Sequence, residues 1–246
     1  MDVQRSSILT PEQFMLQPQR WRWQGFALCR ATFQCAANVP ALAAQSGIVL
    51  PAGIGQAVSK RQSEYLAGRM LVRHLQQELG LACGQVLPAA DRSPQWPAGQ
   101  SGAISHSGGE VLVGLCARPE YSLGLDLEHY LEPAQLMGLR PFIASTAEQQ
   151  WLVQQARSGH WSEAQLLTLL FAAKEALYKA LYPDCQRIME FSAAKVREIS
   201  ATQLSLVLCT DWSAGWRCGS EITLEYQCEA ALVQVLTSVR RRPSQL

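Results

Sequence analysis

Strong net charge, long apolar runs and secretory signals are all missing from this chain of 246 residues. The formal net charge is +1, which gives no case for broad binding to nucleic acid or to a membrane surface. No stretch approaches the ~20 apolar residues that span a bilayer. The N-terminus has no basic segment followed by an apolar one, so no secretory signal is visible. We therefore expect a soluble, cytoplasmic protein without a nucleic-acid partner.

Paired cysteines and the common nucleotide and zinc motifs are missing as well. The eight cysteines include no Cys-x-x-Cys pair, and no Cys/His spacing resembles a structural zinc site. The chain has no Walker A sequence, no Gly-x-Gly-x-x-Gly and no His-Glu-x-x-His. Reduced thiols are expected, and any phosphate or metal chemistry has to come from another arrangement of residues.

The composition that is present is that of a folded globule, with 48% hydrophobic and 17% charged residues. The length fits one large domain or two halves of about 120 residues. A helix is expected over residues 55–79, because its apolar positions follow the 3.6 period and Gly80 is a good C-terminal stop. The other face of this helix has four basic residues, Lys60, Arg61, Arg69 and Arg73.

Two further helices are expected at 146–157 and 162–181, the second ending before Pro183. Residues 84–102 are rich in proline and glycine and should form a loop. Short alternating or apolar runs bounded by turn residues predict strands at 25–33, 103–109 (ending in a Gly-rich turn), 111–117, 121–128, 191–196, 203–209, 222–227 and 231–237.

This order predicts an α+β fold of two similar halves related by a pseudo-twofold, each with a long helix packed on a mainly antiparallel sheet. The boundary falls near residue 118, giving an N-terminal half (1–118) and a C-terminal half (119–246). Because ligands commonly bind between such halves, the active site is expected there. Two fused halves would make a monomer sufficient.

Three charges lie inside the apolar helix of the C-terminal half. Lys174, Glu175 and Lys179 follow a run of leucines, and a buried charge is costly unless it has a partner, a metal or a charged ligand. Glu175 and Lys179 are four residues apart and share a helix face, whereas Lys174 points elsewhere. The simplest interpretation of this spacing is a salt bridge between Glu175 and Lys179.

A second acidic pair, Asp126 and Glu128, lies on one side of the expected strand 121–128. Neighbouring carboxylates repel unless a cation lies between them. Together with Glu175 they offer three hard oxygen ligands of the kind that Mg²⁺ prefers. The two lysines nearby would then neutralise a phosphate group. The alternative is a solvated strand end beside a helix salt bridge.

The segment Ser105-His106-Ser107-Gly108-Gly109 places a hydroxyl, an imidazole and backbone N–H groups in one turn, which can hold phosphate oxygens. The alternative for His106 is an ordinary turn histidine. A serine-hydrolase interpretation fails, because neighbouring residues on a strand point to opposite faces and Ser105 cannot pair with His106.

Taken in order, these segments resemble a 4′-phosphopantetheinyl transferase of the long, two-half type, in particular the bacterial group that includes the enterobactin synthase component D proteins. Each motif alone is weak, but the ordered set is specific and covers roughly residues 55–240. The matching runs are Lys60–Arg69, Trp96–Pro97, Ile104–Gly109, Gly124–Glu128, Phe171–Lys179 and, more weakly, Phe191–Val196.

The resemblance implies transfer of the 4′-phosphopantetheine arm of coenzyme A to a serine of an apo carrier protein (peptidyl, aryl or acyl), with release of 3′,5′-ADP. It implies that Asp126, Glu128 and Glu175 bind Mg²⁺ and that Lys179 contacts the pyrophosphate, with Lys174 close by. The base that takes the serine proton is Glu175 or Glu148, the latter matching a family glutamate near the metal.

On the nucleotide side, assigned to the N-terminal half, the resemblance implies that Ser105 and His106 meet coenzyme A, His106 at its 3′-phosphate. Lys60, Arg61 and Arg69 match a basic position used for that phosphate or the adenine, and which of the three touches the ligand stays open. The group suggests siderophore or other nonribosomal peptide or polyketide synthesis, with fatty-acid carriers as a further option. The rivals are another Mg²⁺-dependent phosphate enzyme and a non-catalytic protein that binds coenzyme A or carriers.

Overall fold

The structure is a computed structural model that describes residues 9–157, 159 and 161–242. The chain divides into two compact units, the first ending at Ala117 and the second beginning at Arg118. Each unit combines helices with an antiparallel sheet, which confirms the predicted α+β class. Among the described residues, no helix is both long and apolar enough to cross a bilayer.

The first unit is built on a four-stranded antiparallel sheet of order β1-β2-β6-β5. The central strands β2 and β6 are buried over most of their length, whereas β1 is mostly exposed. The strands are β1 (Met15–Trp23), β2 (Phe26–Phe33), β5 (Ser101–Ser107) and β6 (Glu110–Cys116), with a separate short pair, β3 (Leu87–Pro88) and β4 (Pro94–Gln95).

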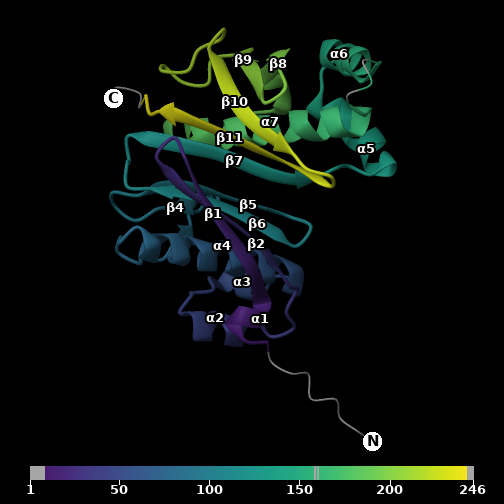
Figure 1. Cartoon of the computed structure of the whole chain (residues 1–246). Coiled ribbons are helices and arrows are strands. Elements are labelled where there is room, and N and C mark those ends of the chain that lie inside the picture. The colour runs from purple at the N-terminus through teal and green to yellow at the C-terminus, as the bar shows by residue number, and fades with distance from the viewer. Residues whose placement is uncertain (1–8, 158, 160, 243–246) are drawn as a thin grey trace, which may run out of the picture. The chain divides into compact units, whose positions relative to one another are not determined.

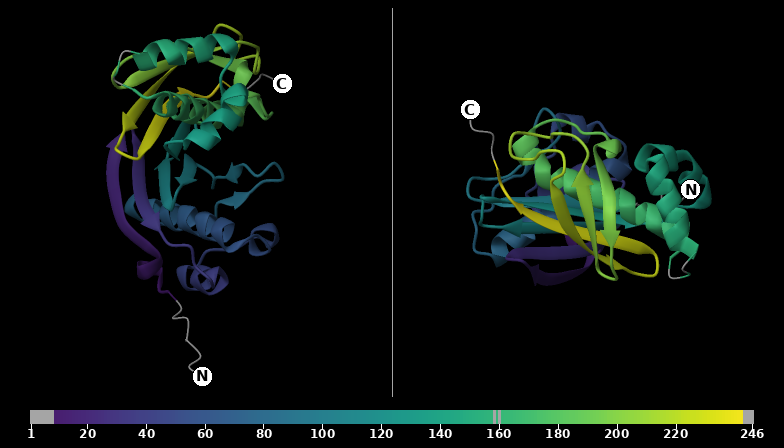
Figure 2. Two further views of the ribbon diagram at one scale, coloured as in Figure 1. Left: turned by 90° about the vertical axis from the view of Figure 1, so that its right-hand side faces the viewer. Right: turned by 90° about the horizontal axis from the view of Figure 1, so that it is seen from above.

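The helix α4 (Ser59–Glu78) covers one face of this sheet, as Figure 2 shows, and contacts β2, β5 and β6. Its buried positions, among them Leu66, Leu71 and Leu75, recur at helical spacing and form one core with β2 and β6. The opposite face is left for the polar and basic residues. Three short helices complete the unit, α1 (Pro11–Phe14), α2 (Val39–Ser46) and α3 (Ala52–Gly55).

The second unit has a five-stranded antiparallel sheet of order β7-β11-β10-β9-β8 (Figure 1). Its strands are β7 (Tyr121–His129), β8 (Ala194–Ile199), β9 (Gln203–Leu208), β10 (Glu221–Cys228) and β11 (Leu232–Arg240). The long helix α7 (Glu163–Cys185) packs mainly on β7 and β11. The other helical segments are α5 (Pro133–Ile143), α6 (Thr146–Arg157) and η1 (Phe191–Ala193).

The approach of α7 to β7 explains why position 124 is glycine. A Cβ atom on Gly124 would lie 1.9 Å from the carbonyl oxygen of Ala176 and 2.9 Å from the Cβ of Ala180. Any side chain here would therefore push the helix off the strand. Asp126, two residues further along β7, is thereby held against the helix.

Several sequence expectations were wrong in detail. Residues 55–79 are not one helix, because α3 ends at Gly55 and α4 starts only at Ser59. The loop 84–102 contains the β3–β4 pair. No expectation covered β1, α2 or α5, whose sequences lack a clear period.

The predicted end of the long helix before Pro183 was also wrong, because α7 continues to Cys185. Proline removes one backbone N–H, but tertiary bonds to the Asp184 carboxylate hold this last turn. Trp216 Nε1 donates to it at 3.0 Å, and Arg241 Nε and the backbone N–H of Arg242 donate at 3.2 and 2.6 Å.

We predict that Gly124→Ala lowers the free energy of unfolding by about 3 kcal/mol, because the methyl group overlaps the Ala176 carbonyl. Urea unfolding followed by circular dichroism measures this. The matched control is Gly138→Ala in α5, where an added Cβ meets nothing within 4 Å. The control should be neutral or stabilising by up to ~1 kcal/mol. Equal stability of the two variants would contradict the close packing of α7 on β7.

Candidate active site

A buried carboxylate and a lysine meet where α7 packs on β7. Asp126 is only 2% exposed, and its Oδ1 accepts a hydrogen bond from Lys179 Nζ at 2.6 Å. A buried carboxylate is tolerated only when it is paired, so Lys179 supplies the charge that Asp126 requires. The helix salt bridge that spacing alone suggested, from Lys179 to Glu175, is replaced by this contact between helix and strand.

Glu175 lies beside this pair. Burial raises the pKa of its carboxyl group; the charge of Lys179 opposes the rise, and the charge of Asp126 adds to it. Glu175 therefore interacts electrostatically with both residues, yet it makes no hydrogen bond or ion pair among the described residues. Two carboxylates and one ammonium group therefore converge, with the oxygens of Glu175 not engaged by a donor.

Glu128 lies two residues beyond Asp126 on β7, so alternation places it on the same side of the strand. Its side chain is half-buried. Within the described part of the chain, no three His, Cys, Asp or Glu side chains are arranged so that they could hold a metal ion as they stand. The donor chemistry nevertheless fits a hard cation, because Asp126 and Glu175 supply carboxylate oxygens that repel one another. The predicted metal ligands stay a prediction.

Glu148 and Lys174 form a second, deeper cluster in the same unit. Both side chains are almost fully buried, and Lys174 Nζ lies 3.0 Å from each of the two carboxylate oxygens. Lys174 also donates to the carbonyl of Ile143 at 2.8 Å. The remaining lone pairs of Glu148 accept from Ser145 N and Oγ at 3.0 and 2.9 Å and from Val196 N at 3.0 Å.

Burial affects the charges of this pair, as the pKa of Lys174 shows. Burial lowers the pKa of the Lys174 ammonium group, and the charge of Glu148 opposes that shift. Among the described residues, neither side chain bonds to Asp126, Glu175 or Lys179. The resemblance implies that Glu148 is a candidate base and that Lys174 lies near the pyrophosphate. In the structure these two side chains form an ion pair with each other.

In the first unit, β5 and the start of α4 bring together His106 and Arg61. Arg61 Nη1 lies 3.0 Å from His106 Nε2, and the Glu64 carboxylate lies 3.5 Å from Arg61 and 3.7 Å from the His106 ring. Lys60, next on the helix, is exposed. Ser105 is 6% exposed and, as strand alternation requires, points away from the His106 side. The structure therefore brings the start of the basic helix next to the histidine strand, and the contact of these residues with coenzyme A stays a prediction.

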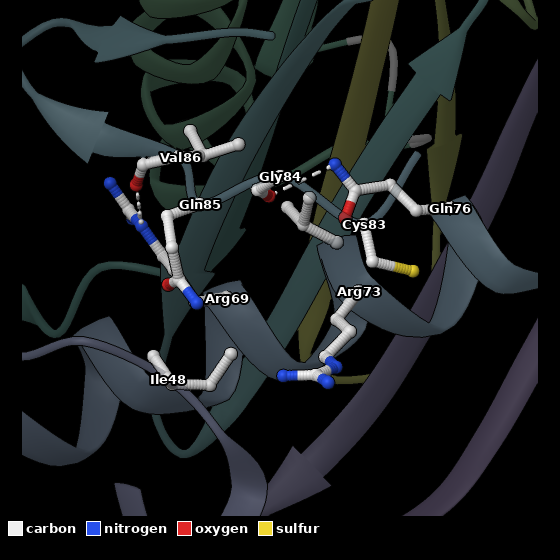
Figure 3. A pocket seen from close by; sticks show the side chains of 9 residues that line it. Ile48, Arg69, Arg73, Gln76, Cys83, Gly84, Gln85 and Val86 are labelled. Atoms are coloured by element: carbon white, nitrogen blue, oxygen red, sulfur yellow. Dashed lines mark hydrogen bonds between the residues drawn. The ribbon is translucent and has the colours of Figure 1, made fainter. Parts of the chain in front are cut away.

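Arg69, two turns further along α4, is held differently (Figure 3). Its Nε donates to the carbonyl of Val86 at 2.9 Å, and its guanidinium lies 4.1 Å from the centre of the Tyr65 ring. Burial lowers the pKa of this guanidinium. Arg69 and Arg73 line one hollow, where Arg73 donates to the carbonyls of Ser46 and Gly47. Both arginines are thus engaged by backbone carbonyls.

Two family models match this chain, one in each of the two units. A family model described as the 4′-phosphopantetheinyl transferase N-terminal domain matches residues 51–115, and one described as the 4′-phosphopantetheinyl transferase superfamily matches residues 122–231. The enterobactin synthase component D of Salmonella typhimurium is 31% identical over 186 residues, covering 75% of each chain. The chain belongs to the 4′-phosphopantetheinyl transferase superfamily.

Other members of this transferase superfamily are similar over shorter stretches. The 4′-phosphopantetheinyl transferase Svp of Streptomyces mobaraensis is 31% identical over 149 residues, 59% of this chain and 58% of the relative. The transferase PptT of Mycobacterium tuberculosis is 29% identical over 145 residues, 58% of this chain and 61% of the relative. The resemblance to the enterobactin synthase component D group is confirmed.

The sequence analysis missed the partners of these site residues. Glu64 lies three residues after Arg61 on the same helix face, a spacing that could have indicated it. Tyr65, whose ring lies under the Arg69 guanidinium, is four residues before Arg69 on the helix, which is also a spacing that places two side chains on one face. The backbone carbonyls of Val86 and Ile143 leave no trace in a sequence.

We predict that Lys179→Met lowers the free energy of unfolding by about 2 kcal/mol, because it leaves the buried Asp126 carboxylate without its cation. Lys179 is partly exposed, so the loss is smaller than for a fully buried pair. Chemical denaturation at neutral pH measures it. Adding Asp126→Asn should recover most of the loss, and Lys195→Met on exposed β8 is the control. A Lys179→Met protein as stable as this control would overturn the pairing.

Proposed function

We propose that this chain transfers the 4′-phosphopantetheine arm of coenzyme A to a serine of an apo carrier protein, in a Mg²⁺-dependent reaction that releases 3′,5′-ADP. The observation that supports this best is the cluster of Asp126, Glu175 and Lys179 in a chain of this superfamily. It combines carboxylate oxygens with an ammonium group, the set that a pyrophosphate and its counter-ion need. We expect the protein to act as a monomer in the cytoplasm.

The second unit would provide the chemical step. Asp126, Glu128 and Glu175 would hold the magnesium ion, which when bound would neutralise charge on the pyrophosphate. Lys179, already 2.6 Å from Asp126, would donate to a phosphate oxygen. A carboxylate takes the proton of the carrier serine. The serine oxygen then forms a bond to the β-phosphorus, the one that bears pantetheine, and the bond from that phosphorus to the bridging oxygen breaks. The electron pair leaves with 3′,5′-ADP.

The first unit would bind the nucleotide. Arg61 and His106 lie 3.0 Å apart and present two nitrogen groups to one place, which suits the 3′-phosphate. Lys60 is exposed beside them and can add charge. Ser105 is nearly buried and its side chain points away from His106, so it would contact the ligand through the backbone of β5. Arg69 keeps Nη donors beyond its bond to Val86 and is the more distant helper.

The relatives point to the biological setting. Several are named enterobactin synthase component D, so we propose a carrier of siderophore or other nonribosomal peptide or polyketide synthesis, with fatty-acid carriers as the alternative. The reaction and the class of carrier can be tested separately, because each apo carrier is assayed on its own.

Intact-mass analysis of several apo carriers with coenzyme A and Mg²⁺ tests the reaction. We expect a mass gain equal to phosphopantetheine on a peptidyl or aryl carrier. Glu175→Gln and Asp126→Asn should reduce the labelling rate at least ~100-fold, because they remove charge at the reacting phosphate. Glu190→Gln on the exposed surface is the control. Hydrolysis of coenzyme A without a carrier would favour another phosphate enzyme, and binding without turnover would favour a non-catalytic relative.

Carrier docking gives a second prediction. The carrier must bring its serine to the second unit, where α5 follows β7 after three residues and packs on α7. Met137 and Phe142 on α5 are 81% and 74% exposed, which is unusual for such large apolar side chains. We propose that these exposed apolar side chains of α5 contact the apo carrier.

Met137→Ser together with Phe142→Ser should raise the KM for the carrier about tenfold, because an apolar contact of two side chains is lost. The KM for coenzyme A should stay within twofold. Steady-state labelling with each substrate varied in turn measures both. The control is Ile188→Ser, an equally exposed apolar residue of the same unit at the other end of α7. An unchanged carrier KM in the α5 variant would remove this surface from the proposal.

A further inference from the structure

Lys174 is next in sequence to Glu175 on α7, but it points to another side of the helix, where it pairs with Glu148 of α6. We propose that Glu148 and Lys174 form a positioning pair, which sets the placement of α7 and thereby of Glu175 and Lys179, and that neither residue touches substrate. This inference rests on the proposed function. It removes Glu148 from the candidate bases and Lys174 from the candidate phosphate contacts.

The bonding capacity of both groups supports this assignment. The carboxylate of Glu148 accepts from Ser145 N, Ser145 Oγ, Val196 N and Lys174 Nζ, all at 2.9–3.0 Å. A general base needs a lone pair within reach of the proton that it takes. With four donors around its oxygens and 4% exposure, Glu148 has none to offer to a serine of another protein.

Lys174 is engaged to a similar degree. Its Nζ donates to Glu148 and to the Ile143 carbonyl, and its side chain is 3% exposed. An ammonium group has three N–H donors, and at least two are used inside the core. Because the side chain is buried, Nζ could reach a phosphate only by leaving the core, which would break these bonds and leave Glu148 as a buried, unpaired charge.

The same contacts explain what the pair does. They join three regions that are distant in sequence: residues 143–148, from the end of α5 to the start of α6, which supply Ile143, Ser145 and Glu148; α7, which supplies Lys174; and β8, which supplies Val196. On the β7 side, α7 is fixed by its contact with Gly124. A helix held on two sides has one rotational setting, and residue 175 follows that setting directly. Displacement of a reacting group by about 1 Å can cost up to 100-fold in rate.

The experiment is a double-mutant cycle with Glu148→Gln, Lys174→Met and the two combined. Thermal unfolding, the kcat of carrier labelling and the KM for coenzyme A are measured for each variant. We expect each single variant to lower the unfolding temperature and to reduce kcat about tenfold, with the KM for coenzyme A unchanged within twofold. The combined variant should recover kcat to within about threefold of the original protein, since no buried charge is left unpaired.

The pair Arg118 and Glu120 provides the matched control, because it is an exposed ion pair of the same unit in the turn before β7. Arg118→Met with Glu120→Gln should change neither kcat nor KM. The inference is overturned if Glu148→Gln loses at least ~100-fold in kcat and Lys174→Met does not restore it, the result expected of a base. It is equally overturned if Lys174→Met raises the KM for coenzyme A tenfold.

The proposed function and this inference fail in different ways. An original protein that labels no apo carrier overturns the function, and the positioning role falls with it. An original protein that labels carriers, combined with single variants that the double variant does not rescue, overturns the positioning role alone. Unfolding temperatures that add without coupling would show that the two side chains do not act as a pair.

Discussion

The approach of α7 to β7 is the contact on which the second unit depends. It is possible only because residue 124 has no side chain, so that the carbonyl of Ala176 can occupy the place of a Cβ atom. Because the two elements are this close, Asp126 is buried. Lys179 on the helix compensates the charge of its carboxylate. Close packing therefore comes first, and the charged cluster follows from it. A looser contact would admit water, and the carboxylate would no longer need the lysine.

The two charged clusters of the second unit differ in how many hydrogen bonds and ion pairs their side chains make. Glu148 and Lys174 bond to each other and to Ile143, Ser145 and Val196, which uses nearly all of their bonding capacity. Glu175, the adjacent residue, makes no such bond among the described residues, and burial raises the pKa of its carboxyl group. Two neighbouring residues of α7 thus have different surroundings: Lys174 is bonded inside the core, whereas Glu175 is partly exposed and makes no such bond.

The α+β class and the strand 121–128, almost to its ends, could be predicted from the sequence. These depend on local periodicity and on alternation, which a sequence displays directly. Sequence reasoning failed where tertiary contacts decide the outcome. Pro183 should end α7, but the bonds from Trp216 and Arg241 to Asp184 keep the last turn in place. Likewise, spacing favoured a bond between Glu175 and Lys179, whereas burial of Asp126 on a neighbouring element redirected Lys179.

The order of the strands in the second sheet has a consequence for how the protein is made. Among the described strands, β7 stands at one end of that sheet, beside β11, residues Leu232–Arg240. The acidic strand therefore leaves the ribosome more than a hundred residues before its hydrogen-bonding partner, and α7 emerges in between. Long-range pairing of this kind is slow and comes late in folding. A chain that ended before β11 would hold Asp126 on a strand without its hydrogen-bonding partner, because Asp126 lies opposite Val235.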